Sequence, residues 1–201
     1  VILLALADIT ACFRFARLAA DIQGAFGFVA EELYFTPSGH VFGSNTSASS
    51  WEPFRRAIKA MITVYAQRDD LIEKHRILLD ELMWFDESSP IPDLVQAFRC
   101  DINRGVVNDQ GTPLPMEANI YVDDILAAAA RRLQMLRLLA AIIEAIFTVC
   151  GIPDIAVRQC PLSLEKWHEL VVGPIQIVLG LVINTNTMTV GITDDYINKV
   201  R

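Results

Sequence analysis

The sequence has few of the side chains that bind zinc. Four cysteines and three histidines occur in 201 residues, and no two cysteines have the C-x-x-C spacing of a zinc site. The histidines His40, His75 and His168 are scattered along the chain. This pattern argues against a zinc site, and we expect the cysteines to be reduced and buried, as they are in proteins of the cytoplasm or nucleus.

Long apolar runs and a secretory signal are missing too. The longest apolar stretches are interrupted by Glu144, or by Gly173-Pro174 and Gly180, so none reaches the roughly 18 residues of a membrane span. Residues 1–7 are apolar, but no basic residue precedes them as in a signal peptide. We therefore expect a soluble intracellular protein, cytoplasmic or nuclear, that is not secreted and has no membrane partner.

Positive charge is scarce. The chain has 17 lysines and arginines against 24 aspartates and glutamates, which gives a net charge of −7 and a pI near 4.9. Proteins that bind the phosphates of nucleic acid usually carry a basic face, and this composition does not predict one. We interpret the basic groups that do occur, such as Arg55-Arg56 and Arg131-Arg132, as solvated helix faces.

Apolar residues are in excess. They make up 53% of the chain, and the mean hydropathy is +0.36, whereas soluble domains usually have about 45–50%. The sequence also begins without an initiator methionine. We expect residues 1–201 to form one domain cut from a larger protein, with apolar surface that packs against its missing neighbours.

Two adjacent carboxylates stand out against this apolar background, in Tyr121-Val122-Asp123-Asp124. Neighbouring acids among apolar residues are unfavourable, because like charges repel and desolvated carboxylates resist ionisation. A divalent cation offsets that cost. Asp8 also ends an apolar segment, so three carboxylates on strand ends could hold two Mg²⁺ ions roughly 3.5–4 Å apart, as in nucleotidyl-transferring polymerases.

These segments resemble reverse transcriptases. Tyr121 to Asp124 is similar to the family's Tyr-x-Asp-Asp motif, and Asp8 to Phe13 is similar to its first palm motif, an Asp followed five residues later by an aromatic residue. Leu179-Gly180 resembles the hairpin that grips the primer end. The matches occur in the family's order and span most of the chain.

The resemblance implies an α+β fold, namely a polymerase palm with an antiparallel sheet, helices packed on one face, and the fingers and thumb largely missing. It implies RNA-directed DNA synthesis, with an RNA or DNA template, a primer and a dNTP as partners, together with the fingers and thumb segments of a parent polyprotein. Asp8 and Asp123 would coordinate two Mg²⁺ ions, or Mn²⁺. Asp124 would complete the cluster, and the carbonyl of Ile9 would be a further ligand.

Other roles follow from the same resemblance. Phe13 occupies the sugar-gate position that disfavours ribonucleotides, although a plain core position is the alternative. Asn45 and Ser47 would touch the nucleotide. Tyr121, Leu179 and Gly180 would contact primer and template. Lys166 or Arg158 would protonate pyrophosphate, and the simpler interpretation of each is a surface cation.

Hydrophobic periodicity predicts the following elements. They are a strand over 1–8, a helix opened by Trp51, a helix over 70–85, a hairpin over 116–126, a helix over 127–150, a strand over 155–160, a helix capped by Ser163, and a final hairpin of 171–184 with 188–192. An insertion relative to retroviral enzymes is expected around 69–115.

A second class of function competes with the polymerase. The chain could be a catalytically inactive or domesticated palm remnant that serves as a structural or interaction module. The net charge of −7, the missing fingers, and the absence of the Gln-Gly and Ser-Pro pairs of the family's second palm motif favour it. The intact carboxylates Asp8 and Asp123 argue against it, because a chain released from catalysis loses them readily.

Overall fold

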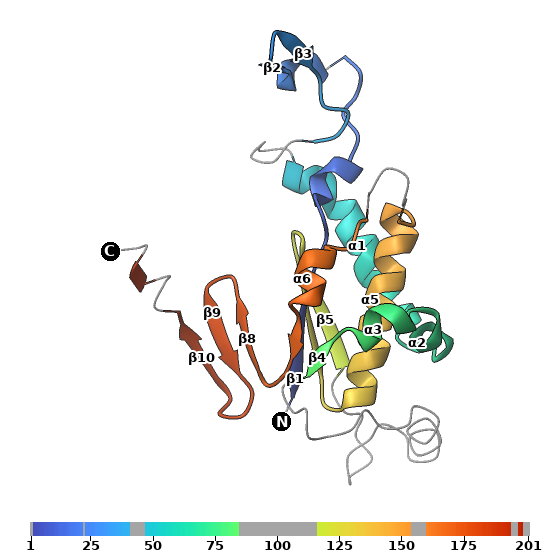
Figure 1. Ribbon diagram of the computed structural model, residues 1–201, viewed down its shortest axis with the longest axis vertical. Helices are drawn as coiled ribbons and strands as arrows, with labels where there is room; N and C mark the ends of the chain where they lie inside the picture. The colour runs from blue at the N-terminus through green and yellow to red at the C-terminus, as the bar shows by residue number, and fades with distance from the viewer. Residues whose placement is uncertain are drawn as a thin grey trace.

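The computed structural model describes residues 2–21, 23–40, 47–84, 116–153, 160–193 and 197–198. Figure 1 shows the arrangement of the helices and strands. In chain order they are β1 Leu3–Asp8, η1 Cys12–Phe15, η2 Gln23–Phe26, β2 Phe28–Ala30, β3 Leu33–Phe35, α1 Ser47–Tyr65, α2 Asp70–Lys74, α3 Arg76–Asp80, β4 Met83–Trp84, β5 Met116–Tyr121, β6 Asp124–Ala129, α5 Arg132–Cys150, α6 Leu164–His168, β7 Val171–Val172, β8 Ile175–Val178, β9 Leu181–Asn184 and β10 Thr189–Ile192.

The central sheet is antiparallel, with the strand order β1-β6-β5. Side chains that lie directly opposite each other share a face, and the register places Ala5, Ala127 and Ala118 in one such row. Helices α1 and α5 pack on this face (Figure 1). The fold is therefore α+β and palm-like, with an antiparallel sheet and helices on one side, as predicted.

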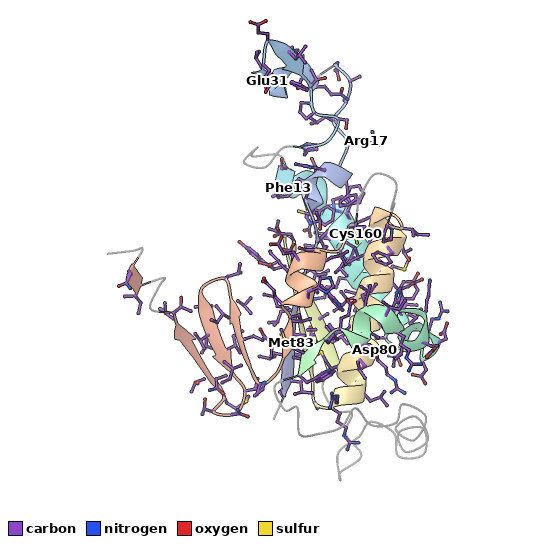
Figure 2. All side chains as sticks on the ribbon, in the orientation of Figure 1. Phe13, Arg17, Glu31, Asp80, Met83 and Cys160 are labelled. Atoms are coloured by element: carbon purple, nitrogen blue, oxygen red, sulfur yellow. The ribbon has the colours of Figure 1, made fainter. Side chains whose placement is uncertain are left out.

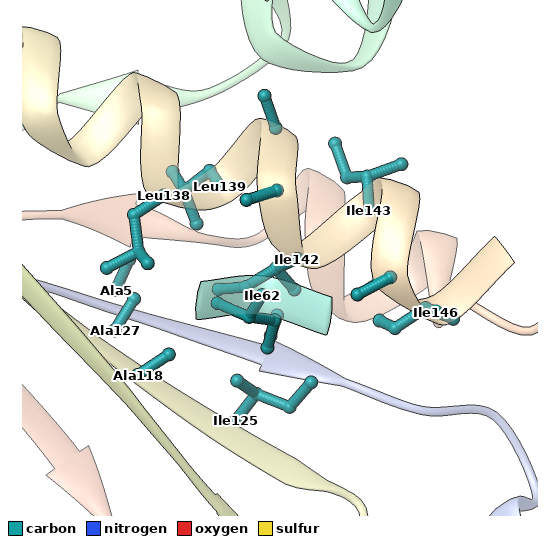
Figure 3. Close-up of a cluster of buried hydrophobic side chains, with 14 of the residues drawn as sticks. Ala5, Ile62, Ala118, Ile125, Ala127, Leu138, Leu139, Ile142, Ile143 and Ile146 are labelled. Atoms are coloured by element: carbon teal, nitrogen blue, oxygen red, sulfur yellow. The ribbon is translucent and has the colours of Figure 1, made fainter. Parts of the chain in front are cut away.

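The core lies between this sheet face and α5. Figure 3 shows Leu138 of α5 above the alanines of the sheet, with Ile142, Ile143 and Ile146 farther along the helix, and all three isoleucines are fully buried. Each contributes about 1.5–3 kcal/mol by leaving water. A row of alanines lets a helix of bulky side chains approach the sheet closely, so small and large residues alternate across the interface.

The alanines at 127–129 form the end of a strand and do not belong to the following helix. The prediction of a helix over 127–150 is wrong at its start, because Ala127 and Ala129 belong to β6 and α5 begins at Arg132. Alanine favours helices intrinsically, but here it pairs with β1 on one side and β5 on the other. The need for small side chains under α5 overrides the local preference.

Two other predictions are corrected. A single helix over 70–85 is wrong, because the helix is interrupted at His75 between α2 and α3, and Met83–Trp84 then pairs with β7 as a parallel strand. The segment 171–184 is not one strand, because a turn at Leu179 and Gly180 separates β8 from β9. Ser163 does precede α6, but its side chain makes no capping hydrogen bond.

Helix α5 is a core helix. Its 19 residues are long and apolar enough to cross a membrane by length and composition, and it is the one such helix in the described part of the chain. However, 67% of its most apolar window is buried inside the protein. The sheet and α1 cover it, and packing therefore accounts for its composition.

Several predictions fall outside the described residues. These are the strand expected over 155–160 except its last residue, most of the insertion expected around 69–115, the nucleotide contact Asn45, and Arg158, the other candidate proton donor to pyrophosphate.

Candidate metal centre at the end of the central sheet

The face of the sheet opposite α5 carries a row of polar side chains at one end. Asp8 of β1 lies directly opposite Asp124 of β6, and Tyr121 of β5 lies opposite Asp124 on its other side. Asp123 follows in the turn between β5 and β6. Ligand atoms of Asp8, Asp123 and Asp124 all lie within 4.8 Å of one another. The prediction that these three acids meet at neighbouring strand ends is confirmed.

The turn that carries Asp123 is strained. Val122 has a φ of +54°, a conformation that is rare for any residue with a side chain and a clear outlier for a β-branched one. Such a residue costs about 1–3 kcal/mol and persists only where its surroundings hold it. Strain of this kind is common at functional sites. The turn at Val122 places Asp123 beside Asp8 and Asp124.

Two segments carry the acids, the end of β1 and the turn between β5 and β6, and we call them the two arms of the acid cluster. Backbone hydrogen bonds hold these arms in place. The amide of Ile9 donates to the carbonyl of Asp123 over 3.0 Å, and the amide of Ser163 donates to the carbonyl of Asp8 over 2.9 Å. The segment before α6 therefore lies along the edge of β1 that does not pair with β6. Ile9 and Leu162 form an isolated antiparallel bridge there. This path carries α6 to the acid cluster.

Lys166 of α6 reaches into the cluster. Its Nζ lies 2.5 Å from Oδ2 of Asp8 and 3.9 Å from Oδ1 of Asp124. The neighbouring Trp167 is fully buried, and its indole N–H donates to the carbonyl of Leu78 over 2.8 Å, which anchors α6 on α3. Lys166 was predicted to be either a surface cation or a proton donor to pyrophosphate. The structure makes it a counter-ion of Asp8.

The electrostatics of the cluster follow from burial and crowding. Burial raises the pKa of Asp124, and the nearby charge of Asp123 raises it further, while Lys166 opposes both effects. The hydrogen bond to Asp8 raises the pKa of Lys166. Asp8 is only 6% exposed, and Asp123 and Asp124 are half-buried. Among the described residues, the one ammonium group that pairs with the cluster is that of Lys166, which contacts Asp8 and Asp124, so the three carboxylates outnumber it.

The donor set suits a hard divalent cation. Carboxylate oxygens are the ligands that Mg²⁺ and Mn²⁺ prefer. Cys12 is a soft donor close enough to feel the charges of Asp123 and Asp8, but burial first, and then the charge of Asp123, raise its pKa to about 12, so it stays a neutral thiol. Within the described part of the chain, the cluster therefore offers the carboxylate oxygens of three acids, which fit Mg²⁺ or Mn²⁺ better than zinc.

A cavity of about 270 Å³ opens beside the cluster. Charged, amide and apolar side chains line it together, from Leu6, Asp8, Lys166, Glu169, Leu170, Val171 and Gln176. A small polar ligand at this position would contact Asp8 and Lys166 together.

The remaining predicted site residues lie around this centre in different ways. Ile9 is fully buried next to Asp8. Phe13, in η1 where that helix meets α1, is 8% exposed and is part of the core (Figure 2). Its burial agrees with the core alternative, and the sugar gate stays a prediction. Ser47 is buried at the first position of α1.

Tyr121, Leu179 and Gly180 are presented to solvent or set in a turn. Tyr121 is 64% exposed beside the acid row, and Leu179 is 54% exposed. Leu179 and Gly180 have φ values of +51° and +81° and form the turn between β8 and β9. The sheet of β8, β9 and β10 extends away from the body of the molecule (Figure 1). The contacts of Tyr121, Leu179 and Gly180 with a primer remain predictions.

Comparison with known proteins identifies the fold. No protein-family model and no curated protein matches the chain. Among solved structures, the foamy viral protease-reverse transcriptase in complex with dsDNA is similar, with a TM-score of 0.50 and 16% identity over 98% of this chain and 28% of that chain. A structure of foamy viral protease-reverse transcriptase with an RNA/DNA hybrid has a TM-score of 0.48 and 15% identity, over 98% and 18%. The chain thus spans less than a third of either protein, and at this identity the likeness concerns the fold.

Proposed function

We propose that this chain is the palm of an RNA-directed DNA polymerase, which joins a deoxynucleotide to the 3′-hydroxyl of a primer. One observation carries the proposal: Asp8 and the pair Asp123-Asp124 lie more than 100 positions apart in the sequence, yet their oxygens lie within 4.8 Å of one another. The palm-like fold agrees with it.

The residues of the chain would divide the work as follows. Asp8, Asp123 and Asp124 would hold two Mg²⁺ ions, which supply Lewis-acid stabilisation of the charge that develops on the transferred phosphoryl group. Strand ends and the strained turn keep these carboxylates rigid, so little reorganisation is needed during reaction. Tyr121, exposed in the same cross-strand row, would support the primer end.

The implied partners are a primed RNA or DNA template and a dNTP. The foamy viral proteins of similar fold were solved with an RNA/DNA hybrid and with dsDNA, which supports a nucleic-acid partner here. The net charge of −7 makes autonomous binding of template and primer weak. We therefore expect DNA synthesis to require the further segments of a parent polyprotein. We expect that protein to act inside the cell.

The inactive remnant is the alternative, and one observation favours it. The ammonium of Lys166 contacts Asp8 at 2.5 Å, which partly neutralises the centre without a metal. A remnant of this kind would retain the fold and use it as an interaction module.

Metal titration separates the two functions. Calorimetry with Mg²⁺ or Mn²⁺ on wild type and Asp123→Asn should show at least about tenfold weaker binding in the variant, because a metal ligand is lost. Asp70→Asn is the matched control, since Asp70, the first residue of α2, also belongs to an acid pair but forms an ion pair with Arg68. Equal binding by wild type and Asp123→Asn would favour the remnant.

An activity assay follows for the full-length parent. Incorporation of dNTPs on a primed RNA template should depend on Mg²⁺ and be abolished by Asp123→Asn, with Asp70→Asn unaffected. A parent with all its segments and intact acids that incorporates no dNTP would contradict the proposed reaction.

A further inference from the structure

Trp51 of α1 lies behind the metal centre and is nearly inaccessible, with 1% of its surface exposed. Its ring stacks on Phe54 at 5.6 Å between centroids and 7° between planes, and it meets Phe15 at 6.3 Å. Its ring is packed among apolar side chains, but its indole N–H is a polar group. It donates a hydrogen bond over 2.7 Å to the carbonyl of Val122, which is 71 positions away in the sequence.

This one side chain touches both arms of the acid cluster. Phe15 belongs to η1, which follows Asp8 by a few residues. Val122 is the residue that turns the chain into Asp123. The indole therefore ties the segment after β1 to the turn between β5 and β6. Because Trp51 and Phe54 fill the space beneath both segments, neither can shift without disturbing the other.

Val122 is also the residue that most needs support. Its φ of +54° is a conformation that valine avoids when free, and such conformations persist only where neighbouring groups hold them. The carbonyl that Trp51 binds belongs to the strained residue itself. Loss of that bond would let the peptide after Val122 rotate and would move the carboxylate of Asp123 away from Asp8.

We propose that Trp51 is a positioning residue for the metal centre, which holds Val122 in its left-handed conformation and so fixes Asp123 and Asp124 relative to Asp8. The inference rests on the proposed function, because it concerns the carboxylates that would bind the cation. It assigns the role to the N–H group specifically, and the ring alone does not fulfil it.

The decisive variant is Trp51→Phe, which keeps an aromatic ring in the core and removes the donor. Mn²⁺ binding, followed by electron paramagnetic resonance of the free ion, should weaken about five- to tenfold, the factor that corresponds to one net hydrogen bond. Tyr65→Phe is the matched control, since Tyr65 also lies on α1 and its hydroxyl shares a hydrogen bond of 3.1 Å with the hydroxyl of Thr148 on α5. This control also removes one hydrogen-bonding group from α1, and it should change Mn²⁺ affinity less than about twofold.

A second variant tests the mechanism through the strain. Glycine adopts a positive φ freely, so in a Val122→Gly background the additional change Trp51→Phe should weaken Mn²⁺ binding much less than it does in wild type. Such coupling is not expected of a tryptophan that merely fills the core, whose effect would be the same in both backgrounds.

The outcomes are distinct. If wild type binds Mn²⁺ more tightly than Asp123→Asn but Trp51→Phe binds it as wild type does, the role of Trp51 is refuted and the proposed function stands. Equal weakening by Trp51→Phe and Tyr65→Phe, or equal effects in the two backgrounds at position 122, refutes it too. If wild type binds no better than Asp123→Asn, both proposals fail.

Discussion

Replacing Lys166 by methionine should raise the affinity of the acid cluster for a divalent cation. The ammonium of Lys166 now occupies the position beside Asp8 and Asp124 that a cation would take, at 2.5 and 3.9 Å from their oxygens. A metal ion must displace this contact and then remain near a positive charge. Methionine keeps most of the length of the side chain and removes that charge.

The magnitude follows from distance and exposure. Two unit charges 4 Å apart interact by about 1 kcal/mol in water and about 4 kcal/mol at an effective dielectric constant of 20. The Lys166 side chain is 56% exposed, so solvent screens it and the lower figure applies. Allowing for the double charge of the ion, we expect a gain of about 1–2 kcal/mol, or about five- to thirtyfold in affinity.

The assay is calorimetric titration with Mn²⁺ at fixed ionic strength. Lys74→Met is a close control, because Lys74 is also 56% exposed and pairs over 2.7 Å with the largely buried Glu144, away from the cluster. Its Mn²⁺ affinity should equal that of wild type. Unchanged or weaker binding in Lys166→Met would refute the reasoning and would indicate that the lysine supports the site in some other way.

Two further predictions concern stability. Burial lowers the pKa of His75 despite its 2.8 Å contact with Glu144, so the neutral ring is favoured in the folded state. This stability is present above about pH 6.5 and is lost as the pH falls through the lower folded-state pKa. The free energy of unfolding from urea titrations should therefore decline less between about pH 6.5 and 5 in His75→Gln than in wild type, and an identical decline would contradict this origin. Separately, a Cβ on Gly39 would lie 2.5 Å from the carbonyl oxygen of Arg14, whereas one on Gly24 would meet nothing within 4 Å. Gly39→Ala should cost about 1–3 kcal/mol in thermal or urea unfolding and Gly24→Ala much less, and equal costs would count against the predicted clash.

The parts of the fold that could be predicted are those where pattern and packing agree. The strand ending at Asp8 is an apolar run closed by one acid, and the hairpin bend at Val122 and Asp123 interrupts two apolar runs. Helix α5 was predicted from its periodicity, and its end was predicted from Gly151, whose φ is +101°. The acids meet because antiparallel pairing brings strand ends together.

The rest depended on contacts between distant segments. Alanine at 127–129 has no local reason to be extended and takes its strand form from its neighbours in the sheet. Lys166 was identified from the sequence as a cation, but nothing near it in the sequence places it against Asp8, 158 positions away. The sequence pattern predicts Trp51 as an apolar residue of a helix. It does not predict the acceptor of its N–H, because the carbonyl of Val122 lies 71 positions away and comes near only when the turn is folded.

The pairing of Asp8 with Asp124 has a consequence for how the chain can change. Successive side chains of a strand point to opposite faces, so inserting or deleting one residue within β1 would turn Asp8 toward α5 and bury an acid among alanines and isoleucines. A change of two residues would restore its direction. The ability to hold a cation is thus tied to whether a count of residues is odd or even, a constraint that lineages can satisfy with very different side chains elsewhere.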